Sequence, residues 1–308
     1  MKDILKDKVA VITGGSRGLG YAIAETYARA GAKVVIASRS ARTVAEAVKK
    51  LQDNGGQAAG QACDVSDIQQ VEALAEFAIR TFGRIDIWVN NAGLSAPYGP
   101  TAQIQSVDFM NVINTNITGT YNGSVVALRY LAAQKSGKLI NLLGRGDNGS
   151  IPLQNAYSSS KVWVRNFTKA LANEYKNSGV DVFGFNPGLV RTEMLSDVHA
   201  ISGYENKLNP LRFVAMLWGN EANVPAAKAL WLASTASDGK TGQMVTVLTP
   251  LFMLSRMLTT GLRWLLQRPI EMMELNISSI QPVQALAPVY VEEEIYSARR
   301  KNSHDQIG

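Results

Sequence analysis

The chain has 308 residues, of which 46% are hydrophobic and 18% charged, and its formal net charge is +6 at pH 7. This composition excludes an intrinsically disordered chain, and the scattered lysines and arginines form no basic block of the kind that binds nucleic acid. The single cysteine, Cys63, excludes a disulfide framework and fits a reducing compartment. Because the first residues are too charged for a signal peptide, we expect a cytoplasmic protein.

The first predicted elements form a strand, a glycine-rich turn and a helix. Residues 9–12 are an apolar, β-branched run that predicts a buried strand, and residues 21–30 predict a helix. Glycines between a strand and a helix let backbone amides approach a pyrophosphate at the helix N-terminus. The cofactor contacts expected in this turn are Gly14, Ser16, Arg17, Gly18, Leu19 and Gly20.

The second predicted strand, residues 33–37, ends at Ser38 and Arg39. A carboxylate at this place would accept hydrogen bonds from the adenosine ribose and favour NAD(H). That acid is missing here, and the guanidinium groups of Arg39 and Arg17 suit a 2′-phosphate, so the sequence favours NADP(H) over NAD(H). The alternative is that both arginines are solvated surface residues.

Further strands and helices alternate along the chain. This alternation predicts an α/β fold with a doubly wound, Rossmann-like parallel sheet that helices cover on both faces. Ligands on such sheets bind beyond the carboxyl ends of the strands. Asp64 follows the third strand and is expected to accept from the adenine amino group, or else to cap the next helix. The further strands are expected at residues 57–62, 85–89, 138–143, 180–185 and 243–248, with helices at 43–54 and from about 67.

Tyr157 and Lys161 lie four residues apart in a predicted helix and therefore on one face of it. A free tyrosine has a pKa near ~10, and a neighbouring ammonium favours the phenolate, which lowers that pKa towards neutral pH. A Tyr-x-x-x-Lys pair also occurs by chance on many surface helices, so its meaning depends on the motifs around it.

Five motifs follow one another along the chain: Thr-Gly-x-x-x-Gly-x-Gly from Thr13, Asn-Asn-Ala-Gly from Asn90, Asn-x-x-Gly from Asn116, Tyr-x-x-x-Lys from Tyr157 and Pro-Gly from Pro187. In this order they resemble the short-chain dehydrogenase/reductase family, over about residues 5–247. The resemblance implies hydride transfer between a nicotinamide and a carbonyl or alcohol carbon of a small molecule. It also implies a homodimer or homotetramer.

The same resemblance assigns roles to single residues. Tyr157 would be the general acid/base, Lys161 would lower its pKa and hold the nicotinamide ribose, and Asn116 would support a water that relays protons. The other cofactor contacts that the resemblance implies, besides Tyr157 and Lys161 themselves, are Asp64, Val65, Asn91, Ala92, Gly93, Pro187, Gly188, Val190 and Thr192.

One position departs from the family's pattern. A serine usually lies thirteen residues before the tyrosine and donates to the substrate oxygen, whereas this chain has Gly144 there. Losing such a donor costs about 2.7–4 kcal/mol of barrier. The candidates for contact with the substrate are Gly144, Arg145, Asn148 and Ser150, or main-chain amides made accessible by Gly144 and Gly146.

Three interpretations of Gly144 stay open. Another donor replaces the serine, or the enzyme is slow or acts on an activated substrate. In the third, the chain binds NADP(H) with little or no turnover and docks its C-terminal helix on a partner or membrane. The complete set of Tyr157, Lys161 and Asn116 favours catalysis, since a pure binding protein needs no proton relay.

Residues 191–224 are expected to form a substrate lid on a catalytic domain of residues 1–249. Their many apolar side chains favour a bulky, apolar substrate, a lipid-like or polycyclic carbonyl compound. The alternative is that these side chains only pack the lid against the domain.

A C-terminal extension, residues 250–308, follows that domain. Residues 251–268 predict a helix with one narrow polar stripe, and its arginines interrupt any apolar run long enough to span a bilayer. We expect this helix to pack on a partner subunit or on its own domain, with contact to a membrane surface as the alternative. Neither His199 nor His304 lies near other potential metal ligands in the sequence, so no metal site is expected.

Overall fold

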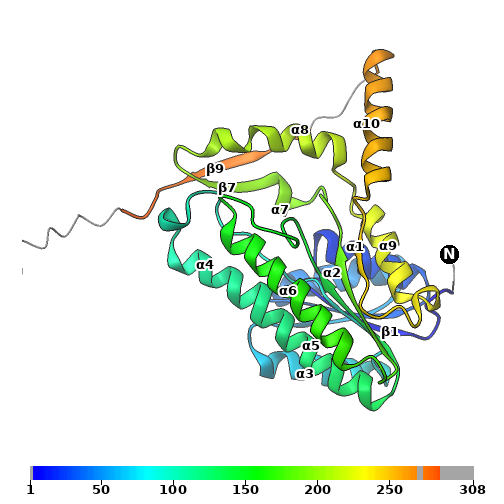
Figure 1. Ribbon diagram of the computed structural model, residues 1–308. Helices are drawn as coiled ribbons and strands as arrows, with labels where there is room; N and C mark the ends of the chain where they lie inside the picture. The colour runs from blue at the N-terminus through cyan, green and yellow to red at the C-terminus, as the bar shows by residue number, and fades with distance from the viewer. Residues whose placement is uncertain (1–2, 269–272, 285–308) are drawn as a thin grey trace, which may run out of the picture.

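The computed structural model describes residues 3–268 and 273–284, so the part of the extension from residue 285 onward lies outside the described residues. Its centre is a seven-stranded parallel sheet in the order β3-β2-β1-β4-β5-β6-β8 (Figure 1). The predicted doubly wound α/β fold is therefore confirmed. The strands are β1 (Val9–Thr13), β2 (Lys33–Ser38), β3 (Gln57–Ala62), β4 (Ile87–Asn90), β5 (Gly137–Leu142), β6 (Val180–Asn186) and β8 (Met244–Thr246).

Helices cover both faces of the sheet because successive strand residues point to opposite sides. Ile12 packs on the side of α1, α2 and α9, whereas Val11 packs on the side of α3, α5 and α6. Burial on both faces is why the strands are nearly continuous apolar runs. The helices of the domain are α1 (Gly18–Arg29), α2 (Ala41–Asp53), α3 (Ile68–Phe82), α4 (Ser106–Val112), α5 (Gly119–Ala133), α6 (Asn155–Glu174) and α9 (Asn223–Ala233).

The predicted lid is built around a second, two-stranded sheet. It contains α7 (Glu193–Ser196), β7 (Asp197–Ile201) and α8 (Asn209–Trp218). Strand β7 pairs in parallel with β9 (Asn276–Ile280), which belongs to the C-terminal extension, over five residue pairs. The extension therefore returns to the lid and lies beside it (Figure 1).

The extension begins with α10 (Pro250–Leu265), which rises away from the sheet (Figure 1). The side chain of Thr249 caps this helix by accepting from the Phe252 amide at 3.2 Å. Helix α10 packs against α8 of its own chain. Within residues 3–268 and 273–284, no helix has the length and apolar character needed to cross a bilayer.

The observed bounds of the predicted strands and helices lie within three residues of the prediction. Helix α1 begins at Gly18 rather than at residue 21, because the glycine turn feeds directly into the helix. The last strand of the sheet is shorter than the predicted range of 243–248, because the chain turns at Val247 towards α10, with the Thr249 amide donating to the Val247 carbonyl at 2.9 Å.

Candidate active site

The glycine turn lies at the carboxyl end of β1 and leads into α1. Gly14 and Gly18 have φ angles of 63° and 56°, a region that glycine enters without a steric penalty. A β-carbon at Gly20 would overlap the Gly14 carbonyl oxygen. No side chain caps α1 at its N-cap residue, Arg17, so the first-turn amides are available to an anion. Leu19, also predicted as a cofactor contact, packs partly against the core.

The Asn-Asn-Ala-Gly turn after β4 is tied to this glycine turn. The Asn91 side-chain amide donates to the carbonyl oxygens of Thr13 and Gly14 at 2.9 and 3.1 Å. The backbone amides of Asn91 and Ala92 donate to the Thr13 hydroxyl at 3.1 and 3.2 Å. Asn91 therefore fixes the shape of the glycine turn from the neighbouring strand.

A cleft of about 580 Å³ opens beside the glycine turn, between α1, α2 and the end of β2. It contains four predicted cofactor residues, Ser16, Arg17, Ser38 and Arg39. Sequence reasoning missed Lys50, which adds a third basic side chain, and its spacing of seven residues from Thr43 on α2 is the signal that could have found it. The lining residues are Ser16, Arg17, Tyr21, Ser38, Arg39, Ser40, Thr43, Glu46, Ala47, Lys50 and Glu193.

Arg17 also forms an ion pair with Glu193 of α7, the first element of the lid. Both side chains are well exposed, so the pair contributes little to stability. Arg39 and Lys50 are exposed on the cleft. Glu46, the other acidic residue that lines the cleft, is paired with Arg42 at 3.0 Å.

Asp64 follows β3, and its carboxylate accepts from the backbone amide and hydroxyl of Ser66 at 2.9 and 2.7 Å. The N-terminus of α3 is capped by Asp67 instead, which accepts from the Gln69 amide at 2.9 Å. The alternative that Asp64 caps this helix is therefore wrong. Val65 is buried against Gly119, where a β-carbon would overlap the Val65 side chain.

Tyr157, Lys161 and Asn116 come together beside Gly93. Tyr157 and Lys161 lie on α6, and the Lys161 ammonium is 5.7 Å from the Tyr157 ring centroid. A β-carbon placed on Gly93 would lie 3.5 Å from the Asn116 side-chain oxygen and 3.7 Å from Lys161 Nζ. The structure therefore brings the three predicted catalytic residues to one point at the carboxyl edge of the sheet.

Asn116 lies in a π-helical segment, Ile113–Thr118, between α4 and α5. Single π turns inside helices occur frequently at functional sites. The buried Asn116 side chain accepts from the Leu94 amide at 2.8 Å and donates to the Ser160 hydroxyl at 2.9 Å. Asn116 thus links the turn after β4 to α6, the helix of the tyrosine.

Gly144 is buried and faces the Tyr157 hydroxyl. A β-carbon at this glycine would overlap the hydroxyl oxygen of Tyr157 and lie 3.1 Å from Cζ of its ring. The tyrosine therefore uses space that any larger side chain at residue 144 would need. Among the predicted substrate contacts, Arg145, Asn148 and Ser150 are exposed.

The loop after Gly144 is anchored by a residue that sequence reasoning missed. Asp147 is buried, and its carboxylate accepts from Arg165 of α6 at 2.7 Å and from Asn186 of β6 at 3.2 Å. The Asn186 side chain also donates to the Gly144 carbonyl at 3.1 Å. Asp147 therefore holds the loop between the tyrosine helix and the sheet.

The pKa of Tyr157 is raised to about 12, mainly by burial and also by the nearby Asp147 carboxylate, against the opposite effect of Arg145. Burial lowers the pKa of Lys161 to about 8, against the opposite effect of Asp147. The causes of the shift at Tyr157 are burial, Asp147 and Arg145, so the expectation that Lys161 lowers the tyrosine pKa stays a prediction. The Lys161 ammonium donates to the Leu142 carbonyl at 3.0 Å.

Residues 187–192 complete this edge of the sheet. Gly188 has a φ angle of 72°, and its amide donates to the Asn186 side chain at 2.9 Å. The Thr192 amide donates to the Val190 carbonyl at 2.9 Å, and a β-carbon on Gly18 would lie 3.4 Å from the Thr192 methyl group. This loop, predicted to contact the cofactor, therefore reaches the glycine turn.

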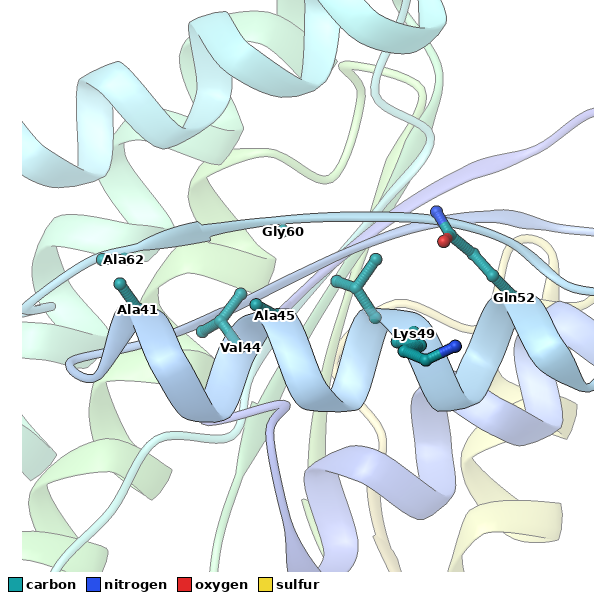
Figure 2. Close-up of a pocket in the computed structure, with 8 residues that line it drawn as sticks. Ala41, Val44, Ala45, Lys49, Gln52, Gly60 and Ala62 are labelled. Carbon is teal, nitrogen blue, oxygen red and sulfur yellow. The ribbon is translucent and has the colours of Figure 1, made fainter.

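A second groove, of about 340 Å³, lies between α2 and the edge strand β3 (Figure 2). A β-carbon at Gly60 would lie 2.8 Å from the Val48 side chain, so the glycine allows close packing of strand on helix. None of the predicted site residues lines this groove. It is separate from the carboxyl edge where Tyr157 lies.

A doubly wound parallel sheet, with a glycine turn after its first strand and a tyrosine–lysine pair at its carboxyl edge, defines the class of dinucleotide-binding oxidoreductases. The family model of short-chain dehydrogenases matches residues 8–201. The chain belongs to the short-chain dehydrogenase/reductase family.

Known members of this family are similar to most of the chain. The 3β-hydroxysteroid dehydrogenase 1 of Eggerthella lenta is 36% identical over 248 residues, 79% of this chain and 92% of its own length. A probable chlorophyll(ide) b reductase of Oryza sativa is 34% identical over 204 residues, 60% of this chain but only 40% of its own length. Among solved structures, a gluconate 5-dehydrogenase from Burkholderia cenocepacia in complex with NADP and tartrate has a TM-score of 0.70 at 28% identity, covering 80% of this chain and 96% of its own.

Proposed function

We propose that the protein reduces a carbonyl compound with NADPH and that Tyr157 is the proton donor. The observation that carries this proposal is the convergence of Tyr157, Lys161 and Asn116 beside Gly93, next to the glycine turn. A protein that only binds a cofactor does not require this combination. The NADP-bound relative of similar fold supports the choice of cofactor.

The residues at this edge fit a dinucleotide. The glycine turn leaves a cradle that a β-carbon would fill at Gly14 and Gly20, and the uncapped amides of α1 would hold the pyrophosphate. The cleft with Arg17, Arg39 and Lys50 would hold the 2′-phosphate of the adenosine. When bound, the nicotinamide supplies the hydride that adds to the carbonyl carbon.

The raised pKa of Tyr157 favours the direction of reduction. With a pKa of about 12, this phenol keeps its proton at neutral pH and acts as an acid rather than a base. Tyr157 would donate that proton to the carbonyl oxygen, which leaves a phenolate. Lys161, with a pKa of about 8, would stabilise the phenolate and return the proton to it.

Tyr157 would also take over the place of the missing serine. Its hydroxyl already lies against Gly144, where a serine side chain would begin. We infer that one hydroxyl, that of Tyr157, both binds and protonates the substrate oxygen. The positive charge of Arg145, which lowers the pKa of Tyr157, would help to stabilise negative charge on the phenolate.

The proposed substrate is a bulky, polycyclic carbonyl compound. Support comes from the lid, where Met194 and Phe213 expose large apolar side chains. Two of the relatives are named for a steroid and for chlorophyll(ide), both polycyclic molecules.

The test is NADPH oxidation by the purified full chain with a panel of steroid ketones, other polycyclic carbonyl compounds and sugar acids. We expect turnover with polycyclic compounds and little with sugar acids. Tight NADPH binding without turnover of any carbonyl compound would instead favour the alternative, a cofactor-binding protein that docks on a partner or membrane through its C-terminal helix.

Replacing Arg39 with alanine should raise the KM for NADPH about 10- to 100-fold, because a hydrogen bond to a charged group contributes about 1.5–3 kcal/mol. The KM for NADH should stay within about twofold, since NADH has no 2′-phosphate. Lys49→Ala is the matched control, as Lys49 is exposed on α2 but lines the other groove. Equal losses for both cofactors would contradict this role of Arg39.

Replacing Asp147 with asparagine should shift the pH profile of reduction to lower pH. Because the Asp147 carboxylate raises the pKa of Lys161, its removal should lower that pKa below about 8. The alkaline limb of kcat, where Lys161 loses its proton, should then begin at a lower pH. Asp86→Asn removes another buried, ion-paired carboxylate and serves as the control. If both variants keep the wild-type profile, Lys161 does not set the alkaline limb.

A further inference from the structure

Helix α10 is held to the lid by its first half. Arg256 donates to the carbonyl oxygens of Leu217 and Gly219 at 3.4 and 3.2 Å, and the Trp218 indole donates to the Met253 carbonyl at 3.4 Å. These bonds fix the helix at the C-terminal end of α8. Its second half then extends beyond the body of the protein (Figure 1).

The second half of α10 exposes a broad apolar face. Leu258, Leu262, Trp264 and Leu265 are 66%, 56%, 75% and 71% exposed, and every residue from 261 to 268 is exposed. Apolar surface of this extent on a monomer marks an interaction site. These leucines recur at spacings of four and three residues, so they share one face of α10, and Arg263 lies on the other side, which is the amphipathic arrangement of a helix that lies in a membrane interface.

The charge around this helix has one sign. Residues 239–270 contain no aspartate or glutamate, and Arg263 and Arg268 are exposed near the end of α10. A second copy of this segment would offer these arginines no carboxylate from its own residues 239–270. Arginines beside leucines and a tryptophan instead suit the boundary between anionic lipid headgroups and acyl chains.

We propose that the second half of α10 binds the surface of an anionic lipid bilayer. A helix of 16 residues rises about 24 Å, which is less than the about 30 Å of a bilayer's hydrocarbon core, so α10 is an interfacial anchor. Because α10 is fixed to α8, binding would bring the lid to the lipid surface. If the proposed function holds, an apolar substrate dissolved in that bilayer would reach the lid without crossing water.

The test is flotation of the full chain with phosphatidylcholine vesicles, with and without phosphatidylglycerol. We expect flotation with the anionic vesicles. The triple variant Leu258→Ser, Leu262→Ser, Leu265→Ser should lose at least about 100-fold in partitioning, because each substitution removes an exposed apolar side chain. The control Val107→Ser, Met110→Ser, Tyr121→Ser changes comparably exposed side chains on α4 and α5 and should float like the wild type.

Charge is tested separately. Arg263→Gln with Arg268→Gln should weaken binding to anionic vesicles about 30-fold, from the attraction of two basic side chains to such a surface. The control Arg42→Gln with Arg80→Gln removes the same amount of charge elsewhere on the protein and should not weaken this binding. Point substitutions are required, because deleting the extension would also remove β9 from the lid.

Several results would overturn the proposal. One is wild-type protein that stays unbound with anionic vesicles. Another is a triple variant that floats normally but loses an oligomeric state seen by light scattering, which would assign α10 to a second copy of the chain. NADPH binding and turnover of a water-soluble carbonyl compound without vesicles should be unchanged in the triple variant, so a failure of the proposed function is distinguished from a failure of lipid binding.

Discussion

Replacing Tyr157 with phenylalanine is expected to lower kcat for NADPH-dependent carbonyl reduction by about 10²–10⁴-fold, the usual contribution of a positioned general acid. The loss should be at the upper end of this range, because Gly144 supplies no hydroxyl that could still donate to the substrate oxygen. The Kd for NADPH, measured by fluorescence, should change less than about threefold, since the ring remains in place. The measurement is steady-state kinetics with the preferred substrate.

Tyr121→Phe is the control, because Tyr121 is a half-exposed tyrosine on α5, outside the site. It should keep wild-type turnover. A Tyr157→Phe variant with unchanged kcat would remove the phenol from the reaction and with it the proposed mechanism. Equal losses of turnover and NADPH binding would show instead that the substitution disturbs the cofactor site.

The second large effect is expected at Gly144. Both Gly144→Ala and Gly144→Ser add a β-carbon that overlaps the Tyr157 hydroxyl, so the ring must move. Overpacking of this kind costs about 1–3 kcal/mol, and we expect both variants to lower kcat about 10- to 100-fold. Restoring the hydroxyl that the family usually has should therefore not increase activity.

Comparing the alanine and serine variants separates the steric effect of the added β-carbon from the effect of the added hydroxyl. If the chain lacks only a hydrogen-bond donor, serine should raise kcat while alanine lowers it, and that outcome would contradict the steric explanation. Gly149→Ala and Gly149→Ser are the matched controls in the same loop, because a β-carbon there meets no atom within 4 Å. They should leave kcat unchanged.

The fold could be predicted because its signals are local. Strand β2 contains Val34, Val35 and Ile36 in succession, and residues buried on both faces of a parallel sheet produce such runs wherever they occur. Gly14 and Gly18 need positive φ angles, so the glycine turn is visible in the sequence as well. The convergence of Tyr157, Lys161 and Asn116 was predicted only through the resemblance to a family.

Other parts of the site depend on contacts between distant residues. Asp147 and Arg165 are eighteen positions apart, and only the fold makes them a part-buried ion pair near the tyrosine. The raised pKa of Tyr157 could not be predicted either, because it depends on burial and on the nearby Asp147 carboxylate. Strand β9 is polar and has no apolar run that would predict a strand. Its pairing with β7 of the lid is therefore visible only in the structure.

The pairing of β7 with β9 has a consequence for anyone building chimeras within this family. Moving residues 191–224 into another scaffold would transplant β7 without the five residues that satisfy its backbone amides and carbonyls on one side. Such a graft should leave the recipient with an edge strand whose backbone N–H and C=O groups are unpaired, and therefore with a tendency to aggregate. The two segments form one exchangeable module, although 74 residues lie between the end of β7 and the start of β9.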